Sequence, residues 1–402
     1  MTEARTAIPR YRPTRAPAVL AQGFRPFFLL AGLYGGGVLL VWTAMLHGGF
    51  APATAFDAVA WHAHEMLYGF TMAVIAGFLL TAIPNWTGRM PLQGLPLLGL
   101  VALWALGRVA VWCSGAIGAG AAMALDLGFP AVFIAVVLRE IVAGRNWRNL
   151  PMVAALTAFT AGNVLMHLEA AGWPGTDGAG ARLGLAVPVA LITLVGGRIV
   201  PSFTRNWLVK RGAARLPASF GTVDRAAMIL TLLALAAFVI VPEGPVVAAA
   251  AFAAAAAQAF RLARWRGMAT RTEPLVAVLH LAYAWIPAGL ALLGLAAALP
   301  SFVPGTAAVH AFGAGAVGAM TLAVMTRATL GHTGRGLQAG RGTALLYAAV
   351  LAAGLSRVAA ALLPEQAILL FSVSALGWAV AFLGFALLYG RALTTRRRTA
   401  GG

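Results

Sequence analysis

Twelve apolar stretches, each long enough to form a membrane-spanning helix, constrain this chain more than any other sequence feature. A helix needs about 20 apolar residues to cross the hydrocarbon core of a bilayer. The stretches cover residues 24–47, 58–84, 92–113, 117–139, 150–172, 183–204, 224–242, 245–262, 274–299, 306–329, 343–363 and 366–390. Only 10% of the residues are charged, whereas soluble domains carry about 25%. We therefore predict an all-α, polytopic membrane protein with twelve transmembrane helices.

The chain is expected to form a single transmembrane domain, residues 1–402, because no interhelical stretch exceeds about 20 residues and domains are larger than that. It divides into a basic arm (1–23), a twelve-helix bundle (24–390) and a basic tail (391–402). Cys113 is the only cysteine, which excludes an internal disulfide, and no CxxCH motif for covalent haem attachment is present.

The formal net charge of +18 is unevenly distributed along the chain. Arginine and lysine residues gather in the arm, the tail and every even-numbered loop, whereas the odd-numbered loops contain only Arg182. By the positive-inside rule, both termini are expected in the cytoplasm. The charge thus indicates topology and contact with anionic membrane lipids, and it does not indicate nucleic-acid binding.

A faint internal repeat links the second and tenth helices. His64 is followed by Thr-Gly-Arg at 87–89, and His310 is followed by Thr-Gly-Arg at 333–335, at the same offsets. The sixth helix ends similarly at 201–205 but has no histidine. Because these helices are four apart, the pattern suggests three units of four helices. The alternative is a general tendency of membrane helices to end in Gly, Thr and Arg.

Six histidines are candidate metal ligands, because neutral imidazole binds copper, zinc and haem iron and can be placed in an apolar bundle. Five of them are expected toward the external side: His47, His62, His64, His167 and His310. The sixth, His280, is expected in the inner half of the ninth helix. A proton relay and histidines that hydrogen-bond neighbouring helices are the alternatives.

The segment 61–68, with the sequence WHAHEMLY, is the most informative part of the sequence about cofactor binding. On an α-helix, His62 and His64 point about 200° apart, so they face different neighbours and do not chelate one metal ion. Glu65 and Tyr68 are candidate catalytic residues, as an acid and a hydrogen-bonding group.

Several longer motifs resemble the NnrS family. They are FRPFFLLAGLYG from residue 24, WHAHEMLYGF from 61, AGFLLTAIPNWTGR ending at 89, GNVLMHL at 162–168, VGGRIVPSFTRNW at 195–207, and VHAFGAGAVGAMTLAVMTRATLGHTGR at 309–335. The resemblance implies a bacterial inner-membrane protein that carries haem and copper and helps cells to tolerate nitric oxide. The twelve-helix pattern is also similar to the catalytic subunit of haem-copper oxidases and nitric oxide reductases. It departs from them because the H-x-H motif lies on the second helix and no His-His pair exists.

The resemblance leads to specific cofactor predictions. His64 and His310 are expected to be axial ligands of one haem b, and His62 is expected to join His167 and His47 at a second cofactor, copper or another haem. Arg108 and Arg357 are candidates to bind haem propionates. The alternative for these arginines is an ion pair with an intramembrane acid, Asp126 or Glu65.

Three classes of function follow from these expectations. The first is a nitric oxide reductase-like oxidoreductase that reduces nitric oxide to nitrous oxide, with electrons from quinol or a separate carrier. The second is a non-catalytic sensor of nitric oxide or protector of cellular iron. The third is a secondary transporter, for which a midplane site with broken helices is expected.

Overall fold

The computed structural model describes residues 16–396, and every regular element in this range is helical. Twelve helices of the described range are long and apolar enough to cross a membrane. The expectation of an all-α, polytopic membrane protein is therefore confirmed. The first 15 residues of the predicted basic arm, and the tail from 397 on, lie outside the described residues.

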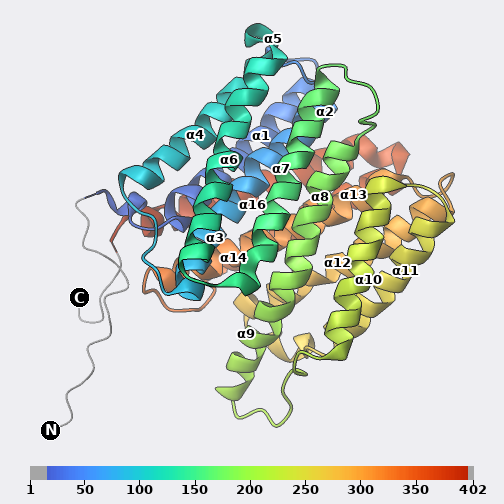
Figure 1. The fold of residues 1–402 in the computed structure, drawn as a ribbon. Coiled ribbons are helices and arrows are strands. Elements are labelled where there is room, and N and C mark those ends of the chain that lie inside the picture. The colour runs from blue at the N-terminus through green and yellow to red at the C-terminus, as the bar shows by residue number, and fades with distance from the viewer. Residues whose placement is uncertain (1–15, 397–402) are drawn as a thin grey trace.

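Nine of these spans are each built on one α-helix: α1 (Phe24–Leu46), α4 (Leu95–Trp112), α6 (Ala119–Ala143), α7 (Leu150–Ala170), α10 (Thr222–Ile240), α11 (Pro245–Ala263), α12 (Pro274–Ala298), α15 (Arg341–Leu362) and α16 (Ala367–Thr394). The other three each contain two α-helices: α2 (Ala58–His64) and α3 (Met72–Thr87), α8 (Ala179–Leu191) and α9 (Gly197–Val209), and α13 (Gly305–His310) and α14 (Gly318–His332). The short helix α5 (Ser114–Ile117) lies in a loop at one end of the bundle, at the top of Figure 1.

A π-helical segment interrupts the second, sixth and tenth spans. The segments are Glu65–Thr71, Ile192–Gly196 and Ala311–Val317. The first and third are 246 residues apart, which is also the separation of His64 and His310. Because π-helical turns are rare in α-helices, their recurrence every four spans supports three units of four helices.

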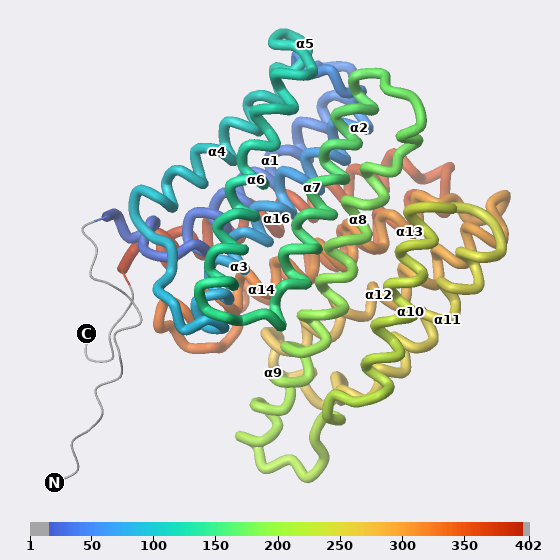
Figure 2. The backbone as a smooth tube through the Cα atoms, in the orientation of Figure 1, coloured from blue at the N-terminus to red at the C-terminus, as the bar shows by residue number. Residues whose placement is uncertain are grey.

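The three units close into a ring. Helix α6 packs on α7, α11 packs on α12, and α16 packs on α1, although α1 and α16 lie at opposite ends of the chain. Figure 2 shows the blue α1 beside the red α16. The π-helical segments of the second and tenth spans both contact α8, so the three interrupted spans meet inside the ring.

Consecutive spans run in opposite directions, so all even-numbered loops lie at one end of the bundle. We call this the basic end; its loops are residues 88–94, 144–149, 210–221, 264–273 and 333–340. The loop after α9 marks this end at the bottom of Figure 1.

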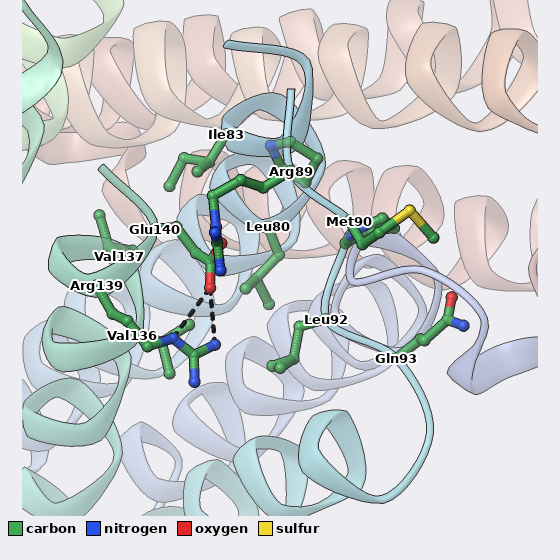
Figure 3. Close-up of a pocket in the computed structure, with 12 residues that line it drawn as sticks. Leu80, Ile83, Arg89, Met90, Leu92, Gln93, Val136, Val137, Arg139 and Glu140 are labelled. Atoms are coloured by element: carbon green, nitrogen blue, oxygen red, sulfur yellow. Dashed lines mark hydrogen bonds and ion pairs between the residues drawn. The ribbon is translucent and has the colours of Figure 1, made fainter. Parts of the chain in front are cut away.

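A cavity of about 410 Å³ at the basic end lies between α3, α6 and the loop that follows α3 (Figure 3). Glu140 holds this loop, because its carboxylate accepts a hydrogen bond from Arg89 at 2.5 Å and pairs with Arg139 at 2.8 Å. No histidine lines this cavity, so it is separate from the sites discussed next.

Candidate metal centre

Helix α2 places a buried histidine next to a buried acid. The helix begins at a cap in which Asp57 Oδ1 accepts hydrogen bonds from the backbone N–H groups of Val59 and Ala60, at 2.8 and 2.9 Å. It ends at His64, and the π-helical segment begins at Glu65. Both side chains are 0% exposed. Because burying an ionisable group is costly unless it is paired, their partners determine what the site can do.

Both ring nitrogens of His64 face oxygen acceptors. Nδ1 lies 2.9 Å from Oε1 of Glu65, and Nε2 lies 2.7 Å from Oδ1 of Asn163. The amide nitrogen of Asn163 donates to Asp126 Oδ2 at 2.8 Å, which orients its oxygen toward His64. This arrangement would satisfy an imidazolium that donates from both ring nitrogens.

Arg108 neutralises two buried carboxylates. Its Nη1 donates to both oxygens of Glu65 at 2.8 Å, and its Nη2 donates to Oδ1 of Asp126. The hydroxyl of Tyr34 also donates to Glu65. With a doubly protonated His64, the two carboxylates and one guanidinium would have no net charge, which is the arrangement that an apolar bundle tolerates best.

Two glycines make room for this ion-pair network. A Cβ atom at Gly69 would lie 2.9 Å from Glu65 Oε2 and 3.0 Å from Arg108 Nη1. A Cβ atom at Gly107 would lie 2.7 Å from Asp126 Oδ1. Any larger residue at either position would push the charged groups apart.

His64, Asp126 and His167 form a candidate metal centre. Asp126 Oδ2 lies 3.3 Å from Nε2 of His64 and 3.1 Å from Nε2 of His167, and the three atoms all lie within 4.8 Å of one another. In a tetrahedral ion site with bonds of about 2.0–2.1 Å, ligand atoms are separated by roughly 3.4 Å. These residues, from α2, α6 and α7, are therefore nearly in position to bind one metal ion, and two imidazoles with one carboxylate suit copper or zinc.

His62, His310 and Arg357 form a second group, which we call the second histidine group. His62 stacks on Trp42 with a ring-centroid distance of 4.3 Å and lies within electrostatic range of His310 and Arg357. Nδ1 of His62 is buried and has no hydrogen-bond partner among residues 16–396. Nδ1 of His310 donates to the carbonyl of Thr306 at 2.8 Å, which leaves its Nε2 as an acceptor.

The part of the chain that matches a known protein family includes both histidine groups. Residues 18–397 match the family model described as NnrS protein. The chain belongs to the NnrS family. No match was found among curated proteins. Family membership fits a metal- or haem-binding protein in general, and the buried His64, Asp126 and His167 could hold a metal ion.

In this member of the NnrS family, the histidines group differently from the sequence expectation. His62 and His64 do face different neighbours. His64 contacts Glu65 and Asn163, whereas Nδ1 of His310 donates to the carbonyl of Thr306, so no contact joins the two histidines and their pairing on one haem stays a prediction. His167 lies with His64 and not with His62.

Two of the candidate histidines take no part in either group. His47 is exposed at the end of α1, where its Nδ1 lies 2.8 Å from the carbonyl of Thr43. His280 contacts Thr204 of α9 at 2.7 Å. Each makes one hydrogen bond, as expected for a structural histidine, and Nδ1 of His280 is buried without a partner among the described residues.

Tyr68 does not lie beside Glu65 in the hydrogen-bonding role predicted for it. The hydroxyl of Tyr68 donates to the carbonyl of Gly180 at 2.8 Å and not to Glu65, so Tyr34 takes the place expected for Tyr68. Both terminal nitrogens of Arg108 are engaged with Glu65 and Asp126, which is the ion-pair alternative, and only its buried Nε has no hydrogen-bond partner among the described residues.

Sequence reasoning did not identify Tyr34 and Asn163 as members of the site, and it weighed Asp126 only as an ion-pair partner. Asn163 lies four residues before His167, so both occupy one face of α7. A polar residue one turn from a histidine in an apolar stretch was the available signal. Nothing local marks Tyr34, because its role depends on the approach of α1 to the π-helical segment.

Proposed function

We propose that the protein is a metal-binding membrane protein of the nitric oxide response, with copper bound by His64, Asp126 and His167. The observation that carries this proposal is the convergence of three buried donor atoms, one from each of three helices, at separations typical of metal ligands. Family membership supports the physiological setting.

The charge of the network favours copper(I). If His64 is doubly protonated, metal binding at its Nε2, which faces Asn163, releases one proton. A monovalent cation that replaces one proton leaves the net charge of the network unchanged. Asn163 and Arg108 would then orient the ligands from outside the coordination sphere, as outer-shell groups do in metal sites.

We further propose that the second histidine group binds a haem. The buried, unpartnered Nδ1 of His62 and the free Nε2 of His310 are available to bind iron, and no salt bridge to Arg357 occurs in residues 16–396, so it can pair with a propionate. When bound, haem would supply the ferrous iron at which nitric oxide coordinates.

Reduction of nitric oxide to nitrous oxide is the activity that we favour, with electrons from quinol or a separate carrier. Two nitric oxide molecules, two electrons and two protons give one nitrous oxide and one water. Nitric oxide is neutral and soluble in lipid, so it can reach a buried site from the membrane. Glu65 and Tyr34, hydrogen-bonded to each other beside His64, are placed to hold a proton there.

Cofactor analysis of purified protein tests the two sites. In His64→Ala and His167→Ala we expect loss of copper with haem retained, and in His62→Ala and His310→Ala we expect an altered haem spectrum with copper retained. His47→Ala and His280→Ala are the matched controls and should keep both cofactors. Unchanged copper in both His64→Ala and His167→Ala would refute the metal centre.

Turnover is tested separately by anaerobic nitric oxide consumption and nitrous oxide detection with reduced protein. Tyr34→Phe should lower turnover while copper content stays unchanged. Formation of a ferrous nitrosyl spectrum without nitrous oxide would favour the sensor or protector of cellular iron over the reductase.

We also propose that the basic end faces the cytoplasm of a bacterial cell, with the protein in the inner membrane. The even-numbered loops of the described range lie together at that end. Their positive charge would contact anionic lipid headgroups.

A further inference from the structure

A second large cavity, of about 750 Å³, opens at the basic end. It lies where the second, sixth and tenth spans meet, and residues of α1, α7 and α12 complete its wall. We call it the basic cavity because three arginines line it: Arg148, Arg198 and Arg327. His332 is the histidine in its wall, and none of the histidines of the metal centre or of the second histidine group lines it, so it is a separate feature.

The basic cavity continues into the middle of the bundle. A smaller apolar cavity of about 100 Å³ shares Phe78, Met152, Val195, Ile199 and Val324 with it. The smaller cavity lies between the three interrupted spans, next to their π-helical segments. The two cavities adjoin, and we call them together the shaft; its part between the three spans is apolar and its part at the basic end is cationic.

The arginines at the mouth have no acidic partner in the cavity wall, and Glu273, outside the wall, lies within electrostatic range of Arg327. No acidic residue lines either cavity. Among residues 16–396 no salt bridge involves Arg148, Arg198 or Arg327. The guanidinium of Arg327 lies 4.0 Å above the ring of Phe203, which holds it at the wall of the cavity.

We propose that this shaft binds a long-chain carboxylate, with its apolar chain between the three central spans and its carboxylate at the arginines. Guanidinium groups bind carboxylates through paired hydrogen bonds, and the apolar wall favours a hydrocarbon chain. The volume is within the range of pockets for small ligands, about 300–1,000 Å³. The narrow inner end suits one chain, so a two-chain phospholipid is disfavoured.

Oleate binding to delipidated, full-length protein tests the proposal, with native mass spectrometry and equilibrium binding as readouts. The charge variant combines Arg198→Gln and Arg327→Gln, and the filling variant is Ile199→Trp. Arg205→Gln, on α9 but outside the cavity, is the matched control. We expect at least about tenfold weaker oleate binding in the charge variant, as loss of charge-assisted hydrogen bonds predicts.

Oleyl alcohol has the hydrocarbon chain of oleate but no carboxylate, so it separates the contribution of the chain from that of the charged head group. It should bind equally to the wild type and the charge variant, and both oleate and the alcohol should be excluded by the filling variant. The control variant should bind oleate as the wild type does.

Three outcomes would overturn the proposal. One is oleate binding that neither variant changes. Another is binding of phosphatidylglycerol but not of oleate, with the same dependence on the arginines, which would assign the cavity to a phospholipid. The third is loss of haem from the charge variant, which would assign the cavity to that cofactor; haem content should otherwise stay unchanged.

Discussion

Each side chain of the metal centre has a partner that restricts its chemistry. Asn163 is the clearest example, because it accepts from His64 and donates to Asp126 at the same time. Loss of such an outer-shell group lowers metal affinity by about 10- to 100-fold in characterised sites. At the residue scale, therefore, the orientation of the ligands depends on residues that do not themselves bind metal.

Asn163→Ala should lower copper affinity by about 10- to 100-fold while the protein stays folded. Competition with a copper(I) chelator measures the change. Thr160→Ala, one turn earlier on α7, is the control, since the Thr160 hydroxyl bonds only the carbonyl of Leu156 among the described residues. Equal affinity in Asn163→Ala and wild type would contradict the role assigned to Asn163.

Arg108→Met should destabilise the protein strongly, because it leaves two buried carboxylates without their cation. Breaking a buried ion pair by removing one partner costs about 3–5 kcal/mol. Thermal unfolding in detergent should show a marked fall in Tm. The control Arg139→Met removes a surface ion pair with an exposed arginine, for which the cost is about 1 kcal/mol or less. Similar Tm values for the two variants would be inconsistent with the network.

At the element scale, the π-helical segments give the three central spans their special geometry. Glu65–Thr71 sets the rotation of α2 relative to α3, and α2 carries both His62 and His64. Removing one residue to leave a regular α-helix in this region would turn α2 by about 100° about the helix axis relative to α3. The same segment therefore controls both histidine groups at once.

Deletion of Met66 should convert this segment toward regular α-helix and rotate the histidines of α2 away from their partners. We expect loss of copper and a changed haem spectrum in a protein that still inserts and remains monodisperse. Deletion of Gly49, in the loop between α1 and α2, is the control for a one-residue shortening. Retention of both cofactors after deletion of Met66 would show that the π-helical segment does not set the register.

At the scale of the whole molecule, the ring of three units places the described even-numbered loops at one end and α5 at the other. This arrangement separates the positive charge from the histidine groups. The buried metal centre and the basic cavity therefore lie in different halves of the bundle.

Cysteine labelling in intact bacterial cells tests this orientation. In a Cys113→Ser background, Ala116→Cys on α5 should react with a membrane-impermeant maleimide from outside. Ala214→Cys, in the loop after α9, should react only after permeabilisation. Both residues are exposed, so access to the reagent is the only difference. The reverse labelling pattern would invert the proposed topology.

The sequence by itself determined the twelve spans, because each depends on a local run of apolar residues that must satisfy its own backbone hydrogen bonds in lipid. It also determined that His62 and His64 face apart, since this follows from the pitch of one helix. The boundaries agree to within a few residues for most spans. The largest differences are at the sixth, which starts at Ala179 and ends at Val209.

Only the tertiary structure decided which histidines meet. His167 joins His64 because α7 packs on α6 and contacts α2, and His310 joins His62 because the first and last units close the ring. The packing of α1 on the π-helical segment of its own unit brings Tyr34 to Glu65, and the meeting of the three interrupted spans leaves the basic cavity between them. These contacts join residues tens to hundreds of positions apart. They depend on which helices become neighbours, and no local pattern of apolar residues specifies that choice.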